Sequence, residues 1–459
     1  MTPARTGDVS FWYADMGGLP AARAPLPGDT TADVCIIGAG YTGLWTAWYL
    51  KEARPDLDIL IVEKSFAGFG ASGRNGGWLT GGFAWSHEKY LATSTPDAVR
   101  GLVRALTGTV DEVIRVAEAE GIDADIRRTD ELVVATNPAQ LARLSAEADH
   151  RRDWGEGDRI WMIPGQEARA RVNIPGTLGG MIVSNVARIQ PAKLVRGLAA
   201  AVEARGVRVV EDTEVTGIAP GRVTTRRGTI RARTVLRCTE GFTATLPGHG
   251  RDWLPLNSAQ IVTEPLPPEV WNEIGWSNHE ILGDFNHAYC YCQRTREGRI
   301  AVGGRGVPYR IGSRTDTNGE PDAETIRRLT TILYRHFPAT RPFRIDHAWC
   351  GVLGVPRDWC ATVGLDPATR LGWAGGYVGT GVSTSNLAGR TLAALALGDD
   401  SDLTRLAWVN RRVRRWEPEP LRWLGVSSMY GLYGLADRSE AKGHGASKLA
   451  AVANRLTGR

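Results

Sequence analysis

Residues 32–64, ADVCIIGAGYTGLWTAWYLKEARPDLDILIVEK, decide the fold of this chain. They read as an apolar strand, a glycine-rich turn, a helix and a second apolar strand that ends in a carboxylate. Gly38, Gly40 and Gly43 fill the G-x-G-x-x-G spacing, which allows a tight turn and a close approach of backbone to a pyrophosphate at the helix N-terminus. Glu63 follows at the distance expected of an acid that hydrogen-bonds an adenosine ribose. The stretch predicts a dinucleotide site in a Rossmann-like domain.

The composition is that of a globular enzyme. The chain has 459 residues, 42% of them hydrophobic and 23% charged, which is enough for two or three domains. The formal net charge of +5 is small for this length, so we expect no nucleic-acid partner. No apolar run is long enough to cross a bilayer, and six cysteines without a C-x-x-C pair predict neither a disulfide framework nor a metal site. We expect a cytoplasmic protein with no integral membrane segment.

The loop after the second strand indicates which dinucleotide binds. Glu63 would repel the 2′-phosphate of NADP, which leaves NAD and FAD open. An NAD-binding domain would continue through a helix into a third strand, whereas this chain enters the glycine-dense loop 65–78, SFAGFGASGRNGGW. Such a loop lets backbone wrap around a large flat group, and a flexible surface loop would leave Phe66, Phe69 and Trp78 unexplained. The loop therefore favours FAD.

The same loop carries a family resemblance. GFGASGRNGGW, residues 68–78, after a Rossmann unit resembles the D-amino-acid-oxidase-like superfamily of FAD-dependent oxidoreductases. Within it the resemblance is to the γ-glutamylputrescine oxidoreductase type, which is related to sarcosine and glycine oxidases. Residues 185–218, 231–246 and 372–395 resemble further segments of the family's FAD domain. The resemblance implies an α/β fold: a discontinuous Rossmann-like FAD-binding domain, an antiparallel-sheet substrate domain and a C-terminal helical extension.

The resemblance also implies how the chain is divided. We expect an N-terminal arm, 1–31, that packs on the body through its aromatic residues. The FAD-binding domain takes 32–85, 185–245 and 345–400, and the substrate-binding domain takes 86–184 and 246–344. The C-terminal extension is 401–459.

The C-terminal extension is basic and contains Trp408, Trp416 and Trp423. These residues would suit either attachment to an anionic membrane or acidic partner, or packing of the tryptophans on the FAD domain. Pro418 and Pro420 interrupt a long amphipathic helix, which favours packing.

The fingerprint and the resemblance together imply the cofactor contacts. In the family, the turn at 379–383 feeds a helix N-terminus toward the pyrimidine edge of the flavin, where the positive end of the helix dipole stabilises the reduced ring. Cys350 is included because sarcosine oxidases bind flavin covalently through a cysteine in a similar place; the alternative is a small buried thiol. The expected contacts are Gly38, Gly40, Tyr41, Thr42, Gly43, Glu63, Lys64, Gly70, Ala71, Ser72, Gly73, Arg74, Asn75, Gly76, Gly77, Val215, Thr239, Gly241, Cys350, Gly376, Gly379, Thr380, Gly381, Val382 and Ser383.

The resemblance implies oxidation of a carbon next to a nitrogen. Hydride would pass to flavin N5 from a small amine or amino acid, and the imine would hydrolyse to an aldehyde or oxo acid plus an amine or ammonia. Such chemistry requires a dry pocket and anchors for the substrate rather than a conventional general base. In monomeric sarcosine oxidase a lysine activates oxygen, and Ala301 stands at the matching position here. The missing lysine argues against a fast oxidase and makes a dehydrogenase credible, so the acceptor is either oxygen or another electron acceptor.

Candidate catalytic residues come from the segments placed near the flavin. Arg74 and Asn75 would stabilise the reduced flavin, or else only wrap the loop around it. Tyr289 and Tyr291 alternate on one strand face and would line the pocket, or else pack in the sheet.

Two arginines and three aromatic residues complete the set. Arg305 and Arg357 are candidates to bind an anionic substrate group through a bidentate guanidinium, with ordinary ion pairs as the alternative. Trp349, Trp373 and Tyr377 would form an aromatic wall that attracts a cationic amine.

Three other functions compete with amine oxidation. A flavin-dependent monooxygenase or halogenase also opens with one Rossmann fingerprint, but usually carries Gly-Asp-Ala where this chain has Gly-Trp-Ala, residues 372–374. An RNA-associated flavoprotein would use the Arg/Trp-rich extension, against which the balanced charge argues. A flavin-binding scaffold without turnover would keep the same cofactor loops.

Overall fold

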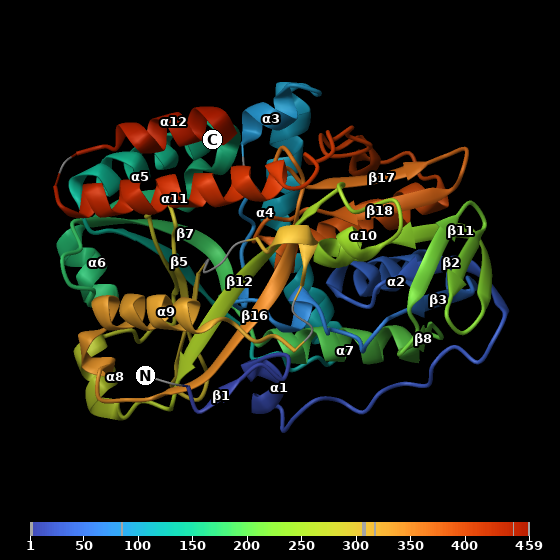
Figure 1. Cartoon of the computed structure of the whole chain (residues 1–459), viewed down its shortest axis with the longest axis horizontal. Coiled ribbons are helices and arrows are strands. Elements are labelled where there is room, and N and C mark those ends of the chain that lie inside the picture. The colour runs from blue at the N-terminus through green and yellow to red at the C-terminus, as the bar shows by residue number, and fades with distance from the viewer. Residues whose placement is uncertain (1–2, 84–85, 305–308, 316–317, 444, 458–459) are drawn as a thin grey trace.

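The computed structural model describes residues 3–457, apart from residues 84–85, 305–308, 316–317 and 444. Arg305, a predicted anchor, lies outside the described residues. Two mixed sheets lie side by side, with helices packed against them and the C-terminal helices α11 (Leu421–Ala441) and α12 (Lys448–Thr457) across one end (Figure 1). The α/β class expected from the sequence is confirmed.

The eight-stranded sheet is built around the fingerprint. Its order is β17-β18-β11-β2-β3-β8, and all neighbours from β18 to β8 are parallel. The strand β3 is ILIV, four buried apolar residues in a row, which is typical of a parallel strand covered on both faces. The strands are β2 (Thr30–Ile37), β3 (Ile59–Val62), β8 (Arg208–Val210), β9 (Val215–Ala219), β10 (Arg222–Thr225), β11 (Thr229–Arg237), β17 (Thr362–Asp366) and β18 (Leu371–Gly375).

Three helices lie together beside this sheet: α2 (Tyr41–Ala53), α7 (Pro191–Ala204) and α10 (Gly381–Leu397). A Cβ on Gly389 would meet the Cβ of Trp45 at 2.6 Å, so α10 and α2 approach at a distance only glycine permits. The largest core cluster lies here, with Trp45 and Leu392 fully buried. The strand β11 lies inside this sheet, between β18 and β2.

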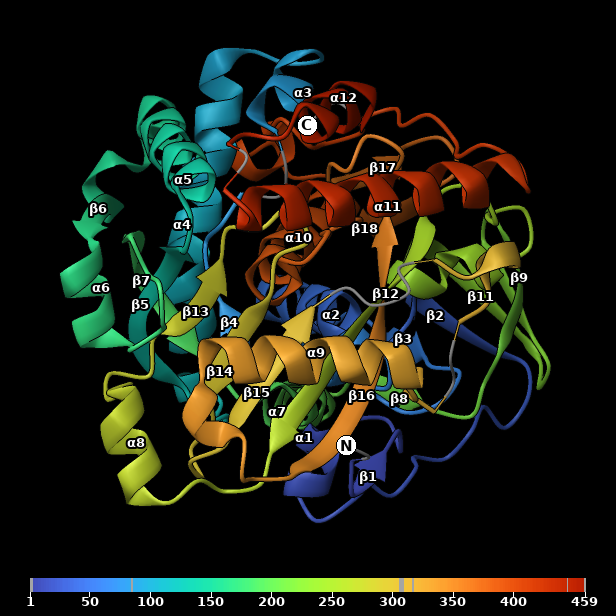
Figure 2. The same cartoon turned by 60° about the vertical axis from the view of Figure 1, so that its left-hand side comes forward.

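The second sheet has ten strands and is mostly antiparallel. Its order is β1-β16-β12-β15-β14-β13-β5-β7-β4, with β6 paired to β7. The helix α9 (Ala323–His336) lies across its face, as Figure 2 shows. The strands are β1 (Arg5–Thr6), β4 (Trp78–Leu79), β5 (Arg127–Ala135), β6 (Ile160–Pro164), β7 (Gly179–Arg188), β12 (Leu254–Thr263), β13 (Ile281–Asp284), β14 (Tyr291–Arg294), β15 (Ile300–Gly304) and β16 (Ile345–Val355).

The remaining helices are α3 (His87–Leu91), α4 (Pro96–Ala119), α5 (Pro138–Arg151), α6 (Gly165–Arg171) and α8 (Pro268–Ile274). The helices α5 and α6 pack against β7 of the second sheet, whereas α4 packs on α10 and its apolar face joins the largest core cluster. The helix α4 begins where the side chain of Thr95 accepts the N–H of Ala98 and proline takes a first-turn position.

The strand β16 opens the segment 345–400, which was expected in the FAD-binding domain, yet it pairs along its length with β12 in the ten-stranded sheet. The division into domains stays a prediction.

The N-terminal arm packs on the body, as its aromatic residues predicted. The strand β1 pairs with β16, and the following helix α1 (Phe11–Asp15) buries Trp12 and Tyr13 to 1% exposure each. The indole N–H of Trp12 donates to the carbonyl of Asn75 at 2.8 Å. The arm therefore supports the glycine-dense loop from beneath.

In the C-terminal extension, no helix runs through Pro418 and Pro420, in line with the prediction. The 21-residue helix α11 begins immediately after Pro420. Trp408 and Trp416 are buried, but Trp423 is 37% exposed, so two of the three tryptophans pack as expected.

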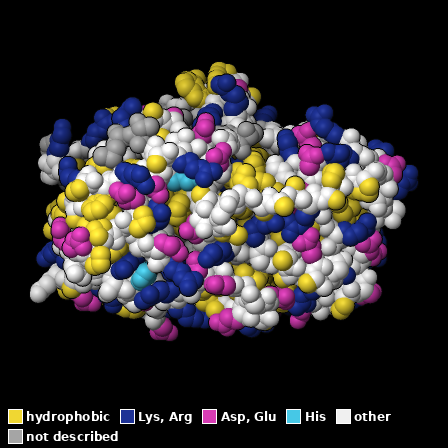
Figure 3. Space-filling model, turned by 90° about the horizontal axis from the view of Figure 1, so that it is seen from below, with side chains coloured by type: hydrophobic (Ala, Val, Ile, Leu, Met, Phe, Trp, Pro, Cys, Tyr) yellow, Lys and Arg dark blue, Asp and Glu magenta, His cyan; other side chains and the backbone are white. Residues whose placement is uncertain are grey.

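Acidic and basic side chains are interspersed over the face of the molecule drawn in Figure 3. Within the described ranges, no helix has the length and apolar character to cross a membrane.

Candidate active site

The glycine fingerprint has the geometry that a pyrophosphate site needs. Gly38 has a φ of +103°, and a Cβ there would lie 2.6 Å from the carbonyl oxygen of Cys238. A Cβ on Gly43 would lie 2.1 Å from the carbonyl oxygen of Gly38. Gly40 precedes α2 without a side-chain cap, so the helix N-terminus is available to an anion. One of its N–H groups, that of Tyr41, donates to Ser72 Oγ at 2.8 Å.

Glu63 lies at the end of β3, beside the fingerprint. Its carboxylate accepts the N–H groups of Ala39 and Ser65, each at 2.9 Å. Burial raises the pKa of Glu63, and these two N–H donors oppose that rise. Neighbouring Lys64 points away and forms an exposed ion pair with Glu214 at 2.6 Å. The Glu63 carboxylate is thus oriented at the strand end, where a ribose would lie. The Lys64 side chain is directed to the surface instead and would not reach the ribose.

The glycine-dense loop is held by its own side chains and by the arm. Asn75 donates its amide to the carbonyl of Ser72 at 2.9 Å and accepts the N–H of Gly77 at 2.8 Å. The guanidinium of Arg74 donates to the carbonyls of Phe69 at 2.7 Å and Cys350 at 3.2 Å, and lies 4.5 Å from the centre of the Phe69 ring. Both side chains expected to stabilise reduced flavin therefore brace the loop, whose backbone faces the cavity described below.

The turn before α10 presents a second helix N-terminus. Gly379 has a φ of +120°, and Thr380 begins α10 without a side-chain cap. The hydroxyl of Ser383 donates to the carbonyl of Thr80, which fixes this first turn against the end of β4. The backbone N–H groups at the start of α10 are therefore free of side-chain competition and suit the electron-rich edge of a flavin.

Sequence reasoning missed Glu240, which organises this region. It begins a short 3-10 helix (Glu240–Thr245), and its buried carboxylate accepts the N–H groups of Gly354, Gly376 at 3.0 Å and Tyr377 at 3.1 Å. Burial raises the pKa of Glu240 to about 7. The carboxylate ties β16 to the turn before α10. An acid between Thr239 and Gly241, two expected cofactor contacts, was the signal that could have revealed it.

A cavity of about 780 Å³ that is partly open to solvent lies between the two sheets and the extension. The loop backbone from Arg74 to Gly76 forms one wall, and residues from Val378 to Val382 form another. Tyr291 lies against Gly76, since a Cβ on that glycine would be 2.7 Å from its ring, and its hydroxyl is 2.9 Å from Ser258 Oγ. Tyr289, 36% exposed, also lines the cavity. Both predicted tyrosines thus reach the space beside the cofactor loop.

The other predicted pocket residues lie away from the cavity. Arg357 pairs with Glu417 at 3.0 Å, which is the ordinary ion pair considered above. Trp349 is fully buried against the arm and donates its indole N–H to the carbonyl of Arg74 at 2.9 Å. Trp373 donates to Thr362 Oγ1 at 3.3 Å. The hydroxyl of Tyr377 is 2.8 Å from Thr42 Oγ1, also outside the cavity wall. This geometry does not support an aromatic wall built from these residues.

The strand β16 turns Cys350 away from the cavity. Gly351 and Leu353 line the cavity, and because side chains alternate along a strand, Cys350 points to the opposite face. Its thiol lies in the second core cluster, 3.5 Å from the carbonyl oxygen of Glu320. Ala301, at the position of the oxygen-activating lysine, is buried beside Trp349. Covalent attachment through Cys350 has no support from this arrangement.

The end of the cavity away from the cofactor loop is lined by charged side chains, which no sequence motif predicted. The carboxylate of Glu131 on β5 accepts the hydroxyl of Thr80 at 3.2 Å, and burial raises its pKa. Arg143 on α5 pairs with Glu440 of α11 at 2.7 Å. Arg151 pairs with Glu156, also at 2.7 Å. The extension thus borders this end of the cavity: Asn454 of α12 lines it, and α11 supplies the partner of Arg143.

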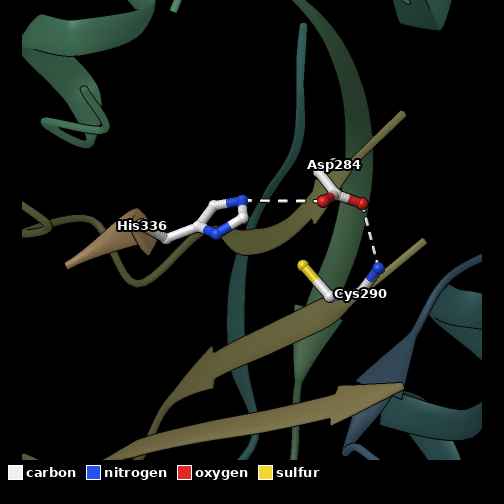
Figure 4. Close-up of side chains that lie close together, drawn as sticks. All are labelled: Asp284, Cys290 and His336. Carbon is white, nitrogen blue, oxygen red and sulfur yellow. Dashed lines mark hydrogen bonds and ion pairs between the residues drawn. The ribbon is translucent and has the colours of Figure 1, made fainter. Parts of the chain in front are cut away.

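One group in the cavity wall has the donor types of a metal site. Donor atoms of Asp284, Cys290 and His336 lie within 4.8 Å of one another (Figure 4). His336 Nε2 lies 3.6 Å from the Asp284 carboxylate, which also accepts the N–H of Cys290 at 2.9 Å and an amide N–H of Asn286. The guanidinium of Arg335 approaches the same carboxylate at 3.5 Å. With these donors in place, the carboxylate braces the wall rather than presenting a free ligand.

Comparison with known proteins identifies the relatives of this architecture. The family described as FAD dependent oxidoreductase (DAO) matches residues 33–395. The chain is 30% identical to γ-glutamylputrescine oxidoreductase of Escherichia coli K12 over 402 residues, which cover 86% of this chain and 90% of the relative. It is 22% identical to sarcosine oxidase subunit beta of Rhodobacter capsulatus over 391 residues, 79% of this chain and 86% of the relative.

Solved structures share the fold. Glycine oxidase from Geobacillus kaustophilus superposes with a TM-score of 0.69 at 20% identity, covering 83% of this chain and 99% of the other. L-proline dehydrogenase from P. horikoshii superposes with a TM-score of 0.66 at 19% identity, covering 82% and 96%. At these identities the likeness concerns the fold.

Proposed function

Since the chain belongs to the DAO family of FAD-dependent oxidoreductases, we propose that it oxidises the carbon next to the nitrogen of a small amine in the cavity between its two sheets. The product is an imine, which hydrolyses to an aldehyde or oxo acid plus an amine or ammonia. The observation that carries this site assignment is the cavity itself, which the cofactor loop and the start of α10 border together.

The residues present fit FAD. Gly38, Gly40 and Gly43 leave the space that a Cβ would fill, Glu63 faces the ribose position, and the start of α10 faces the cavity. When bound, FAD supplies a hydride acceptor at the flavin N5. The expected contacts at Val215 and Thr239 stay predictions. Lys64 lies apart from them in its ion pair with Glu214.

The chain's own contribution is to bind and orient the substrate and to exclude water. Trp78, Tyr289 and Tyr291 give the cavity aromatic surfaces, which attract an amine cation and shed water when it enters. Tyr291 is fixed by its contact with Ser258, so its ring holds one orientation beside the loop. These positions support the assignment of Tyr289 and Tyr291 as substrate-contacting residues.

We further propose that the enzyme works in the cytoplasm and passes electrons to an acceptor other than oxygen. Six buried cysteines without a disulfide support a reducing compartment. Alanine at position 301, and the absence of lysine among the described residues of the cavity wall, support slow reaction with oxygen.

An anaerobic panel of amines and amino acids tests this function. We expect loss of the oxidised flavin absorbance with at least one amine and none with NADPH. Bleaching by NADPH alone would instead favour the alternative of a monooxygenase or halogenase. Purified protein that never retains FAD would contradict the proposal.

A further inference from the structure

The positive charges of the cavity wall are already engaged. Arg143 holds the Glu440 carboxylate with contacts of 2.7 and 2.9 Å. Arg151 holds Glu156 with contacts of 2.7 and 3.0 Å. Arg74 donates to two backbone carbonyls of the cofactor loop and β16. The carboxylate partners of Arg143 and Arg151 are buried, so these guanidinium groups are held in place and are not offered to a substrate.

Two carboxylates of the same wall have no such partner. Within the part of the chain that the structure describes, neither Glu131 nor Glu147 has an ion pair, and Glu131 accepts only the hydroxyl of Thr80. The other acids of the wall differ: Asp284 faces Arg335 and His336, and Glu88 lies 3.7 Å from His150. Arg151 and Arg159 attract the carboxylate of Glu131 from beyond ion-pair distance, and Arg151 also attracts that of Glu147. Both guanidinium groups pair with Glu156, at 2.7 and 3.5 Å, so two cations serve three carboxylates and offset their negative charge only in part.

Glu131 is the carboxylate nearer to the cofactor segments. It projects from β5 and bonds Thr80, and the carbonyl of Thr80 accepts the hydroxyl of Ser383 in the first turn of α10. Thr80 alone thus links Glu131 to the first turn of α10, which borders the cavity and would face a bound flavin. Glu147 lies on α5, toward the end that the extension borders. A substrate that reaches from the cofactor loop into the charged end meets Glu131 on the way.

A partly buried carboxylate without a cation is costly, and a cationic ligand removes that cost. The aromatic surfaces of Trp78, Tyr289 and Tyr291 favour a cation in the same space. An amino acid would bring a carboxylate into this field with no unengaged arginine to receive it among the described wall residues. The charge pattern therefore selects against a free α-carboxylate and for a second positive charge.

We propose that the cavity selects amines that carry a second ammonium group, and that Glu131 binds this group. The inference rests on the proposed function and names its substrate class. Glu131 is a specificity-determining residue: it contacts the end of the substrate that does not react.

Equilibrium binding to the oxidised holoenzyme under anaerobic conditions tests the proposal. The probes are a short linear α,ω-diamine, the monoamine of equal chain length and the matching ω-amino acid, followed by calorimetry and by changes in the flavin spectrum. We expect the wild-type protein to bind the diamine at least tenfold more tightly than the monoamine, and the ω-amino acid least. In Glu131→Gln the tenfold preference should vanish while monoamine binding stays within twofold. The exposed Glu118→Gln on α4 is the matched control and should change nothing.

The outcomes separate this proposal from the function on which it rests. A wild-type protein without a preference for the diamine overturns it, and so does a preference that survives in both Glu131→Gln and the double variant with Glu147→Gln. Loss in the double variant alone would move the anchor to Glu147 and overturn the role of Glu131. If the diamine binds as expected but never reduces the flavin, the charge recognition stands and the oxidation fails.

Discussion

At the scale of single residues, Gly43 has the least freedom to vary. The third fingerprint glycine lies in the first turn of α2, and a Cβ there would lie 2.1 Å from the backbone oxygen of Gly38. We expect Gly43→Ala to lower the free energy of unfolding by about 3 kcal/mol, because backbone rather than a movable side chain must shift, and to reduce the FAD content of the purified protein. Denaturant unfolding and the ratio of flavin to protein absorbance measure the two effects.

Gly108 provides the matched control for that substitution. It lies in the interior of α4, exposed, with nothing within 4 Å of a built Cβ. Gly108→Ala should raise the free energy of unfolding by about 0.5–1 kcal/mol, because alanine loses less backbone entropy in a helix, and should leave the FAD content unchanged. Equal behaviour of the two variants would refute the steric role of Gly43.

Glu240 makes stability depend on pH. Its pKa is about 7 in the folded protein against an ordinary value of 4.5, so the folded state holds the proton more tightly than the unfolded state. The stabilisation by that proton is complete below pH 4.5 and is lost as the pH rises through 7. Relative to Glu240→Gln, which cannot ionise, the wild type should lose up to about 3 kcal/mol between these pH values. Denaturant unfolding at a series of pH values measures the difference, and parallel curves for the two proteins would contradict it.

At the scale of elements, α11 holds wall residues of the cavity in place through its carboxylates, and α12 adds Asn454 to the wall. Glu440 holds Arg143, and the carboxylate of Asp437 accepts the N–H groups of His287 at 2.8 Å and Ala288 at 3.0 Å. We expect a protein ending at residue 420 to keep FAD but to show a KM for its amine raised at least tenfold, since the segment before Tyr289 loses its anchor. Steady-state kinetics measure the change.

A second truncation isolates the cause. A protein ending at residue 442 lacks α12 but keeps Asp437 and Glu440. Its KM should rise much less than that of the shorter protein, because only Asn454 is lost from the cavity wall. If both truncations raise KM equally, α12 rather than the contacts of α11 shapes this end of the cavity.

Elements with local signals could be predicted from the sequence, and strand faces could not. The unit β2-α2-β3 follows from glycine spacing, apolar runs and one acid, all within 33 residues. Trp349, Cys350 and Gly351 are consecutive on β16, and which of them faces the cavity depends on a register of one residue set by pairing with β12, far away in the sequence. The charged residues from β5 and α5 meet the cofactor loop only through the tertiary fold, so no motif reveals them.

At the scale of the whole molecule, one sheet carries the cofactor-binding segments and the other carries residues that would contact the substrate. The parallel sheet presents the cofactor segments, and the antiparallel sheet supplies the tyrosines and Glu131. Substrate range can therefore vary through one sheet while the cofactor segments of the other persist.

The reaction of the whole enzyme with oxygen follows from the same division. Ala301 is buried, and the described cavity wall contains no lysine, so a cationic group that promotes electron transfer to oxygen is missing from these residues. We expect the reduced enzyme to react with dissolved oxygen at least about 100-fold more slowly than with a quinone acceptor, a difference of about 2.7 kcal/mol in barrier. Stopped-flow reoxidation measures both rates. Rapid reaction with oxygen alone would make the protein an oxidase.

The pairing of the arm with β16 determines when, during synthesis of the chain, the arm can dock on the body. Arg5 and Thr6 of β1 pair with His347 and Ala348 of β16, so β1 cannot form until that later part of the chain has been synthesised. Trp12 meanwhile supports the loop at Asn75. A nascent chain that has not reached β16 lacks the strand that holds the arm against the body, so we expect FAD to bind only after β16 has been synthesised.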